Sequence, residues 1–491
     1  MAHPEAPEQK QLSLQNQVPL TLTQADLGGN PLRQYLRFRR DPIGFLMDTQ
    51  PLADLVRIPS VTGKPSYILH HPELIKAVLA LEEHKVVKGN SAQILGITLG
   101  RGLLTSEDPE HSVQRRLMQP AFHKNMLESA SGEIVRLTHQ RIHSWPVGAF
   151  FPISDAFLDL TLDVVFHTLF GASVGEDRSR LHRAVEDSVR FSAQRLMSAL
   201  PVPLWLPTPM NRRHRRAVDS LDEVIEKLIQ QGQERVGMAV GSGSSSRPTS
   251  EASGSESISS VSAAHSFTAS NVLDYLFAVR TESGEGLSRQ EIRDQLATFI
   301  IGGHETTANL LGWVVFELAR HPQAWEEAAR EVDRVLAGRH PTFEDVRKLG
   351  FIRQVLRETM RLYPPAWTVL RETVEDLRVA NVEIEAGAAL IISPYVLHRS
   401  PHDFPQPETF DPQRFSDEVE HTWRQFSYIP FGAGSRTCIG NTFAQMEAAF
   451  ILAMLIQRYR WTLPSGTPVH PEPSVSLRIR DGLRVVLTPR S

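Results

Sequence analysis

Cysteine is almost absent from this sequence: Cys438 is the only one among 491 residues, so no internal disulfide can form. A chain without disulfides is typical of a reducing compartment. Long hydrophobic runs are also absent. The longest run covers only residues 448–456, whereas a membrane-spanning helix needs about 20 apolar residues. The N-terminus lacks the basic start and apolar core of a signal peptide. We therefore expect a soluble, cytoplasmic protein without a membrane anchor.

An excess of either charge is missing as well. The chain has 52 basic and 56 acidic residues, which gives a formal net charge of −4. A nucleic-acid-binding protein normally shows a basic surplus or a basic stripe. The hydrophobic fraction of 41% is ordinary for a globular chain. We expect a globular protein that does not bind nucleic acid.

The one cysteine lies in a glycine-rich stretch, Phe431-Gly-Ala-Gly-Ser-Arg-Thr-Cys438-Ile-Gly440. Glycines let backbone N–H groups approach the sulfur, where they favour the thiolate and tune its electron donation to a metal. A lone cysteine is more often a small buried hydrophobic residue, but this context favours a metal ligand. A phosphate-binding loop is excluded, because Thr437 occupies a position where the dinucleotide fingerprint needs glycine and no Gly-Lys-Ser/Thr ending follows.

A long helix is predicted over residues 288–320. The pattern Ser288-Arg-Gln-Glu291 is a capping box, and at 1.5 Å per residue the helix would be about 50 Å long. Its middle contains Gly302-Gly-His-Glu-Thr-Thr307. Two glycines cost about 2 kcal/mol of helix propensity relative to alanine, which suggests that another group approaches the backbone there. A zinc-protease interpretation fails, because Ala308 stands where that motif needs histidine.

The cysteine stretch resembles the heme-thiolate signature Phe-Gly-x-Gly-x-Arg-x-Cys-x-Gly of the cytochrome P-450 monooxygenases. The resemblance extends over roughly residues 30 to 490, and the other motifs follow in the family's order. It implies a mainly α fold with small β-sheets (α+β). It also implies heme b (iron protoporphyrin IX) held between the long central helix and the cysteine-loop helix. The absence of an N-terminal anchor suggests a bacterial-type member.

The resemblance also implies roles for individual residues. Cys438 would be the thiolate ligand of the iron, Thr306 would donate a hydrogen bond to bound dioxygen, and Glu305 would relay protons. Gly302 and Gly303 would let the heme and dioxygen approach the helix. Helix geometry by itself predicts that His304 is turned away from the oxygen side. Further heme contacts, including cationic groups for the heme carboxylates, are expected from His111, Arg115, Arg371, Arg436, Phe431, Gly432 and Gly440.

The remaining implied residues shape the surroundings of the site. Glu358, Arg361 and Arg414 would form a buried triad that locks the loop leading to the cysteine, and Phe299, Ala366 and Val369 would border the substrate. Taken alone, Glu358 and Arg361 could be an exposed ion pair. Likewise, the pattern His111-x-x-x-Arg115 could be a solvated basic helix face.

The function implied by the resemblance is monooxygenation of a lipophilic small molecule, a fatty acid or a terpenoid. Because the chain ends about fifty residues after Cys438, electrons from NAD(P)H are expected through a separate ferredoxin or flavodoxin and its reductase. Two alternatives stay open. One is a peroxygenase or isomerase of the same fold, although such variants tend to lose the acid–alcohol pair. The other is a non-catalytic heme-thiolate sensor.

The predicted organisation is one domain, residues 26–491, after a flexible N-terminus of residues 1–25. Residues 241–270 include thirteen serines and are predicted to be a disordered insertion, because they cannot bury enough apolar surface. Two hairpins are predicted, one between Leu55 and Leu69 and one from Leu477 to Leu487 around an Asp-Gly turn.

Overall fold

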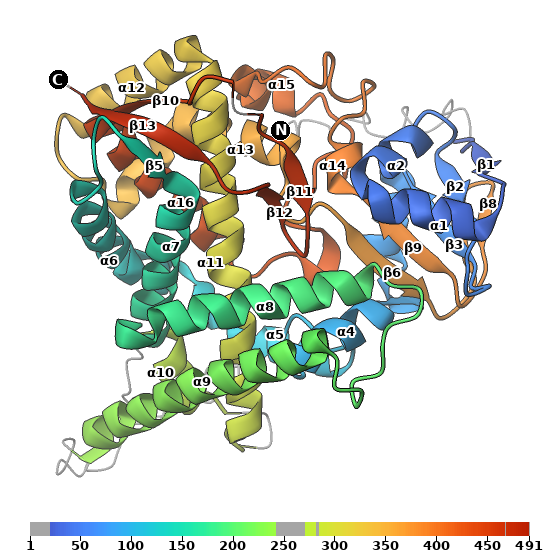
Figure 1. Cartoon of the computed structure of the whole chain (residues 1–491), viewed down its shortest axis with the longest axis horizontal. Helices are drawn as coiled ribbons and strands as arrows, with labels where there is room; N and C mark the ends of the chain where they lie inside the picture. Colours follow the sequence, from blue (N-terminus) through green and yellow to red (C-terminus); the bar gives the residue numbers. More distant parts are fainter. Residues whose placement is uncertain (1–19, 242–270, 281–283, 467, 491) are drawn as a thin grey trace, which may run out of the picture.

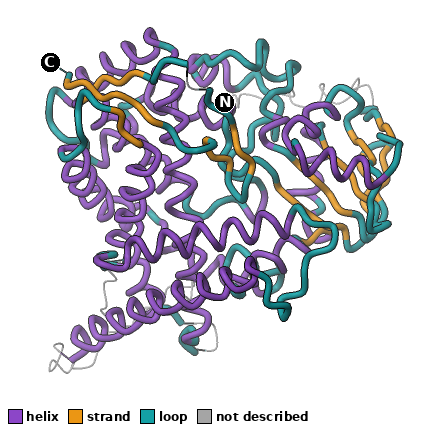
Figure 2. Tube along the Cα trace, viewed as in Figure 1, coloured by secondary structure: helices purple, strands orange, loops and turns teal. Residues whose placement is uncertain are grey.

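The computed structural model describes residues 20–241, 271–280, 284–466 and 468–490. Helices form most of it and small β-sheets lie among them, which confirms the predicted α+β class (Figures 1 and 2). The predicted insertion falls almost wholly in residues 242–270, which lie outside the described residues, and so do residues 1–19 of the predicted flexible N-terminus.

The long central helix is α11 (Arg289–Arg320), and it begins at the predicted capping box. The Ser288 side chain accepts from the Glu291 N–H, and the Glu291 carboxylate accepts from the Ser288 N–H. α11 packs along α7 (Ile153–Phe170), which is largely buried because its apolar residues occur on all sides. The other long helices are α6 (Lys124–His143), α8 (Arg178–Leu196), α9 (Pro209–Gly241), α12 (Pro322–Leu336), α13 (Gly350–Leu362) and α16 (Asn441–Arg458). The shorter ones are α3 (Pro72–Lys76), α4 (Asn90–Leu99), α5 (Glu110–Met118), α10 (Val272–Ala278), α14 (Pro394–Leu397) and α15 (Asp417–Glu420).

The largest sheet has the strand order β1-β2-β3-β9-β6-β4. The predicted first hairpin is present, since β2 pairs antiparallel with β3. Successive residues face opposite sides of a sheet: Leu55 and Leu69 belong to one buried cluster, Val56 and Ile68 to another. Both faces are therefore covered, with α1 (Pro31–Arg40) and α2 (Pro42–Thr49) nearby (Figure 1). The strands are β1 (Gln24–Asp26), β2 (Leu55–Arg57), β3 (Ser66–Leu69), β4 (Val86–Val87), β6 (Val369–Thr373) and β9 (Ala389–Ile392).

Strand β1 corrects the predicted start of the folded region. Gln24 pairs with Leu55 and Ala25 with Val56, in parallel. The folded region therefore begins before residue 26, because the edge of the sheet offers backbone hydrogen bonds to a segment whose polar sequence does not indicate a strand.

The predicted second hairpin is wrong, although its turn is present. Asp481 and Gly482 both have positive φ, +61° and +70°, as a tight Asp-Gly turn requires. The strands on either side then diverge into different sheets. β12 (Leu477–Ile479) pairs with β11 (Pro471–Pro473), and β13 (Arg484–Pro489) lies between β10 (Tyr459–Thr462) and β5 (Phe150–Pro152). Burial of alternate β13 side chains in the main core decides this pairing over the local one.

Candidate active site

The cysteine stretch forms a tight loop that ends where α16 begins. The Cys438 N–H donates to the Phe431 carbonyl at 2.9 Å, and the Gly440 N–H donates to the Cys438 sulfur. Gly434 has φ +70°, and a Cβ there would lie 1.6 Å from the Leu79 carbonyl oxygen. Glycine is therefore required at this position, and the contact fixes the loop against the π-helical turn of residues 77–81.

Cys438 is a free cysteine with an exposed side chain. The surrounding protein raises the pKa of its thiol, whereas the Gly440 N–H and the Arg115 guanidinium lower it. The N-terminus of α16 follows directly, and a helix N-terminus also favours a thiolate. A bound metal cation would deprotonate such a thiol. The loop therefore presents one sulfur with anion-stabilising groups on its protein side.

Basic side chains from distant parts of the chain gather beside this loop. Arg371 comes from β6, and its pKa is lowered to about 10 by burial and by the charge of Arg436. Lys88, which follows β4, has its pKa lowered to about 7 by burial and by the same two arginines. No carboxylate pairs with Arg371 in the part of the chain that the structure describes. Sequence reasoning missed Lys88, because no motif or spacing marks it.

Arg436 differs from the other cations because acidic side chains pair with it. It donates to Glu107 at 2.9 Å and lies 3.4 Å from Asp108, and it also donates to the Ser106 carbonyl at 2.8 Å. The structure therefore ties the cysteine loop to the segment before α5 through Arg436. Its predicted contact with a heme carboxylate stays a prediction.

The donor set fits the two carboxylates of heme. His111 is buried, and burial lowers its pKa to about 4, so its ring is neutral near pH 7. Its Nδ1 makes no hydrogen bond among the described residues and lies 3.8 Å from Asp108 Oδ1. Arg115 donates only to a backbone carbonyl, that of Thr437. Arg115, Arg371 and Lys88 form a cationic cluster, and none of the three pairs with a carboxylate in the described part of the chain; neutral His111 lies beside them. Buried donors without acceptors are unfavourable. Two carboxylates would supply the missing acceptors.

The middle of α11 presents one open position and one packed position. A Cβ on Gly302 would meet nothing within 4 Å, whereas a Cβ on Gly303 would lie 3.0 Å from Val165 on α7. Thr306 lies one turn after Gly302 and donates to its carbonyl at 2.9 Å. The open face therefore belongs to Gly302 and Thr306, and Gly303 serves the contact with α7.

Glu305 is held by two polar residues that sequence reasoning missed. The Ser476 hydroxyl donates to Glu305 Oε1 at 2.7 Å, and the Asn309 amide donates to that hydroxyl at 2.9 Å. Burial raises the pKa of Glu305, while the hydrogen bond from Ser476 lowers it. In the sequence, only the spacing of Glu305 and Asn309, i and i+4 on one helix face, could have indicated this network.

His304 lies away from this network, as predicted from helix geometry. It is buried, and its Nδ1 lies 2.7 Å from the Ile300 carbonyl. Burial lowers its pKa to about 4. Its ring centroid is 6.2 Å from that of His182 on α8, so His304 belongs to the contact of α11 with its neighbouring helices.

The residues of the predicted triad lie together. Arg361 donates to both oxygens of Glu358, at 2.7 and 2.8 Å, and both side chains are fully buried. Arg414 Nε lies 3.5 Å from Glu358 Oε1. Arg361 also donates to the carbonyls of His398, Pro407 and Thr409. One buried ion pair thus anchors the segment that leads toward the cysteine loop.

The predicted substrate residues occupy different environments. Phe299 on α11 is buried, with its ring centroid 5.7 Å from that of Phe122. Ala366 is exposed, and Val369 is half-buried at the start of β6. Their assignment to a substrate pocket stays a prediction.

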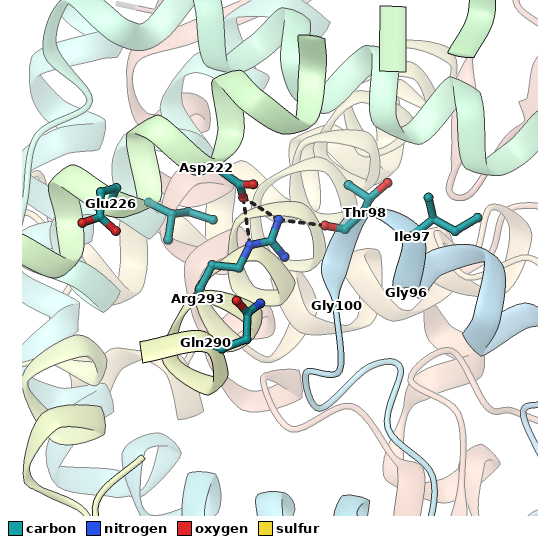
Figure 3. A pocket seen from close by; sticks show the side chains of 9 residues that line it. Gly96, Ile97, Thr98, Gly100, Asp222, Glu226, Gln290 and Arg293 are labelled. Atoms are coloured by element: carbon teal, nitrogen blue, oxygen red, sulfur yellow. Dashed lines mark hydrogen bonds and ion pairs between the residues drawn. The ribbon is translucent and has the colours of Figure 1, made fainter. Parts of the chain in front are cut away.

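A separate cavity of about 350 Å³ lies between α4, α9 and the start of α11 (Figure 3). Arg293 donates to Asp222 Oδ1 at 2.8 and 2.5 Å and to the Thr98 carbonyl at 3.1 Å. No predicted site residue lines this cavity. Arg293 therefore ties α4, α9 and α11 together.

In the described part of the chain, no helix combines the length and apolarity that crossing a bilayer would require.

Comparison with known proteins supports the assignment made from these residues. The family model for cytochrome P-450 matches residues 55–485. Cyclooctatin synthase of Streptomyces melanosporofaciens is 33% identical over 466 residues, 94% of this chain and 95% of that protein. Cyclooctat-9-en-7-ol 5-monooxygenase of the same organism is 33% identical over 432 residues, 87% of each.

A solved structure shares the fold. The heme domain of cytochrome P450DA superimposes with a TM-score of 0.80 at 22% identity, covering 96% of this chain and 98% of that one. The match extends over nearly the whole described chain, and the exposed Cys438 lies in the loop that carries the family's thiolate signature. The chain therefore belongs to the cytochrome P-450 family of heme-dependent monooxygenases.

Proposed function

We propose that this protein inserts one oxygen atom of dioxygen into a C–H bond of a lipophilic small molecule, a fatty acid or a terpenoid. The observation that carries the proposal is the acid–alcohol pair on α11, with Thr306 on the open face and Glu305 held by Ser476. Heterolytic cleavage of an O–O bond needs protons delivered in a dry site, whereas a heme sensor does not need a held acid. The name of one relative, cyclooctat-9-en-7-ol 5-monooxygenase, favours a cyclic terpenoid.

In the proposed mechanism, bound heme supplies dioxygen activation, which the thiolate ligand promotes. Cys438 would be that ligand, and the α16 N-terminus and the Gly440 N–H would hold its negative charge. His111, Arg115, Arg371 and Lys88 would bind the heme carboxylates and so orient the group.

The residues of α11 would move protons. Burial keeps a proton on Glu305 to higher pH than on an exposed carboxyl group. Glu305 would pass that proton toward the Thr306 hydroxyl on the open face. The hydrogen bonds from Ser476 and Asn309 fix the orientation of this acid, and proton transfer depends on such fixed geometry.

The electron donors are proposed as separate proteins, a ferredoxin or flavodoxin with its NAD(P)H-dependent reductase. The test of the function is turnover with a surrogate ferredoxin and reductase, using lipophilic compounds selected by a spin-state shift of the heme spectrum. An oxygenated product supports the proposal. Consumption of reductant without any oxygenated product across the compounds that bind favours the sensor.

Replacing Thr306 by alanine is expected to uncouple the enzyme. Without the hydroxyl, proton delivery becomes misdirected, so NAD(P)H oxidation continues while product per reductant falls about tenfold or more and peroxide is released. Product, peroxide and reductant are measured in the same reaction. Thr298→Ala is the matched control, because its hydroxyl donates to the Asp294 carbonyl on the same helix. Tight coupling in Thr306→Ala would refute the role of this hydroxyl.

Replacing Ser476 by alanine is expected to move the pH dependence of coupling upward. The Ser476 hydroxyl stabilises ionised Glu305 and lowers its pKa. Its loss therefore raises that pKa, and the protonated acid persists to higher pH. The carboxyl infrared band of Glu305 and the pH profile of product per reductant should shift together. Ser474→Ala, two residues away, should leave both unchanged, and an unshifted Ser476→Ala profile would contradict the assignment.

A further inference from the structure

The hydrogen bond that holds Glu305 comes from a short turn, residues 474–476, which joins β11 to β12. These two strands form a two-stranded sheet, and β12 contacts α11 (Figure 1). A two-stranded hairpin is marginally stable by itself in water. The position of Ser476, and with it the orientation of Glu305, therefore depends on contacts between the turn and other segments.

Helix α11 holds the turn from one side. The Asn309 amide donates to the Ser476 hydroxyl at 2.9 Å, and Trp313 Nε1 donates to the Leu477 carbonyl at 3.4 Å. Both donors lie on the helix that also carries Glu305. These contacts bring the hydroxyl to the acid, but they do not fix the far side of the hairpin.

The segment after α13 holds the turn from the other side. Trp367 Nε1 donates to the Ser474 carbonyl at 2.8 Å, and the Leu477 N–H donates to the Pro365 carbonyl at 2.9 Å. Trp367 is itself fixed, because the Ser393 hydroxyl donates to its carbonyl at 2.8 Å. The turn is thus clamped between α11 and residues 365–367.

Trp367 is 2% exposed and belongs to the same buried cluster as Leu477, so packing alone would account for its burial. Packing does not account for its acceptor. A buried indole N–H needs one partner, and here that partner lies two residues before the hydroxyl that binds Glu305. The Ser474 N–H also donates to the Ser476 carbonyl at 3.1 Å. A hold on Ser474 is therefore a hold on Ser476.

We propose that Trp367 is a positioning residue for Glu305, because its indole N–H keeps the turn 474–476 where the Ser476 hydroxyl meets the carboxyl group. The inference rests on the proposed role of Glu305 as a proton donor. Without the indole N–H, the Ser474 carbonyl loses a donor and the hairpin is held mainly from α11. Ser476 then donates to Glu305 for a smaller fraction of the time. Because that hydrogen bond lowers the pKa of Glu305, the acid keeps its proton to higher pH.

The test is Trp367→Phe in the heme-loaded, full-length protein. The carboxyl infrared band of Glu305, assigned by its loss in Glu305→Gln, is followed against pH. Product per reductant is measured over the same range with the surrogate redox proteins. We expect both to shift upward by up to about one pH unit, which is equivalent to one hydrogen bond. The double variant Trp367→Phe/Ser476→Ala should shift no further than Ser476→Ala, since both changes act through one hydroxyl.

Trp461→Phe is the matched control. Trp461 is 3% exposed, and its Nε1 donates at 2.9 Å to the Val315 carbonyl, which lies on α11 and not in the turn. This variant loses a buried indole hydrogen bond of the same kind, and the midpoint of the Glu305 band should stay unchanged. An equal shift in Trp461→Phe would overturn the proposal, as would a wild-type midpoint in Trp367→Phe or additive shifts in the double variant.

Circular dichroism and heme content show whether Trp367→Phe is folded. If it is not, the tryptophan isostere benzothienylalanine is placed at residue 367, where a sulfur atom replaces the N–H and the ring shape is kept. The same upward shift is expected, and its absence would overturn the proposal.

The infrared midpoint decides the role of Trp367 without turnover, so the two proposals fail separately. A shifted midpoint in Trp367→Phe, with product per reductant unchanged there and in Glu305→Gln, would support the positioning role and refute Glu305 as the proton donor. Loss of product per reductant in Glu305→Gln, with an unshifted midpoint in Trp367→Phe, would support the proposed function and overturn this inference.

Discussion

Replacing Cys438 by alanine is expected to abolish the strongly red-shifted Soret band of the reduced, carbon monoxide-bound protein. That band requires a thiolate ligand, and Cys438 is the only cysteine in the chain, so no other residue can supply one. Any heme that the variant keeps should show the ordinary carbon monoxide band, because the cationic cluster still binds the carboxylates. Monooxygenase turnover should fall to background, since the thiolate promotes O–O cleavage.

The control for this variant is Thr437→Ala. The Thr437 hydroxyl donates only within the loop, to the Gly434 carbonyl at 2.8 Å, so the red-shifted band should persist. Far-ultraviolet circular dichroism of both variants separates loss of the ligand from loss of the fold. A red-shifted band in Cys438→Ala, or its absence from the wild-type protein, would refute the assignment of the ligand.

Replacing Arg361 by methionine is expected to destabilise the protein by about 3–5 kcal/mol, the range found when one partner of a buried ion pair is removed. The variant leaves Glu358 fully buried without its bidentate donor, and the carbonyls of His398, Pro407 and Thr409 lose a donor as well. Heme content should fall too, because Arg361 anchors the segment that leads toward the cysteine loop. Urea unfolding gives the change in free energy, and the heme absorbance gives the content.

The pH dependence of this variant has a defined sign. Burial raises the pKa of Glu358, and Arg361 opposes that effect. Without Arg361 the folded-state pKa lies further above the unfolded value. The folded variant then binds more protons than the unfolded chain, and its stability falls as pH rises through this interval. The loss in free energy of unfolding relative to the wild type should therefore be larger at neutral pH than at acidic pH.

The exposed pair of Arg378 and Glu383 provides the comparison. It joins β7 (Leu377–Val379) to β8 (Val382–Ile384), and its side chains are 76% and 65% exposed. Removal of an exposed pair costs under about 1 kcal/mol. If Arg361→Met lowers the free energy of unfolding no more than Arg378→Met does, the buried pair does not anchor the fold.

The sequence by itself determined the elements that are continuous along the chain. The capping box at Ser288 and the apolar periodicity after it predict both ends of α11, because helix ends depend on donors and acceptors a few residues away. The thiolate loop could be predicted for the same reason, because contacts within it are local: the Cys438 N–H donates to the Phe431 carbonyl at 2.9 Å. The contact of Gly434 with the Leu79 carbonyl, by contrast, depends on the tertiary structure.

The tertiary structure alone decided which distant residues complete the site. Ser476 lies 171 residues after Glu305, and Lys88 joins the cationic cluster only because β4 packs beside β6. Gly302 and Gly303 are the same residue type on one helix, yet only packing against α7 distinguishes the open position from the filled one. The turn predicted within residues 477–487 is present, but the strands on its two sides do not pair with each other as predicted. Local chemistry determines turns and caps, whereas strand pairing, burial and the pKa of a buried group depend on contacts between segments that the sequence does not place together.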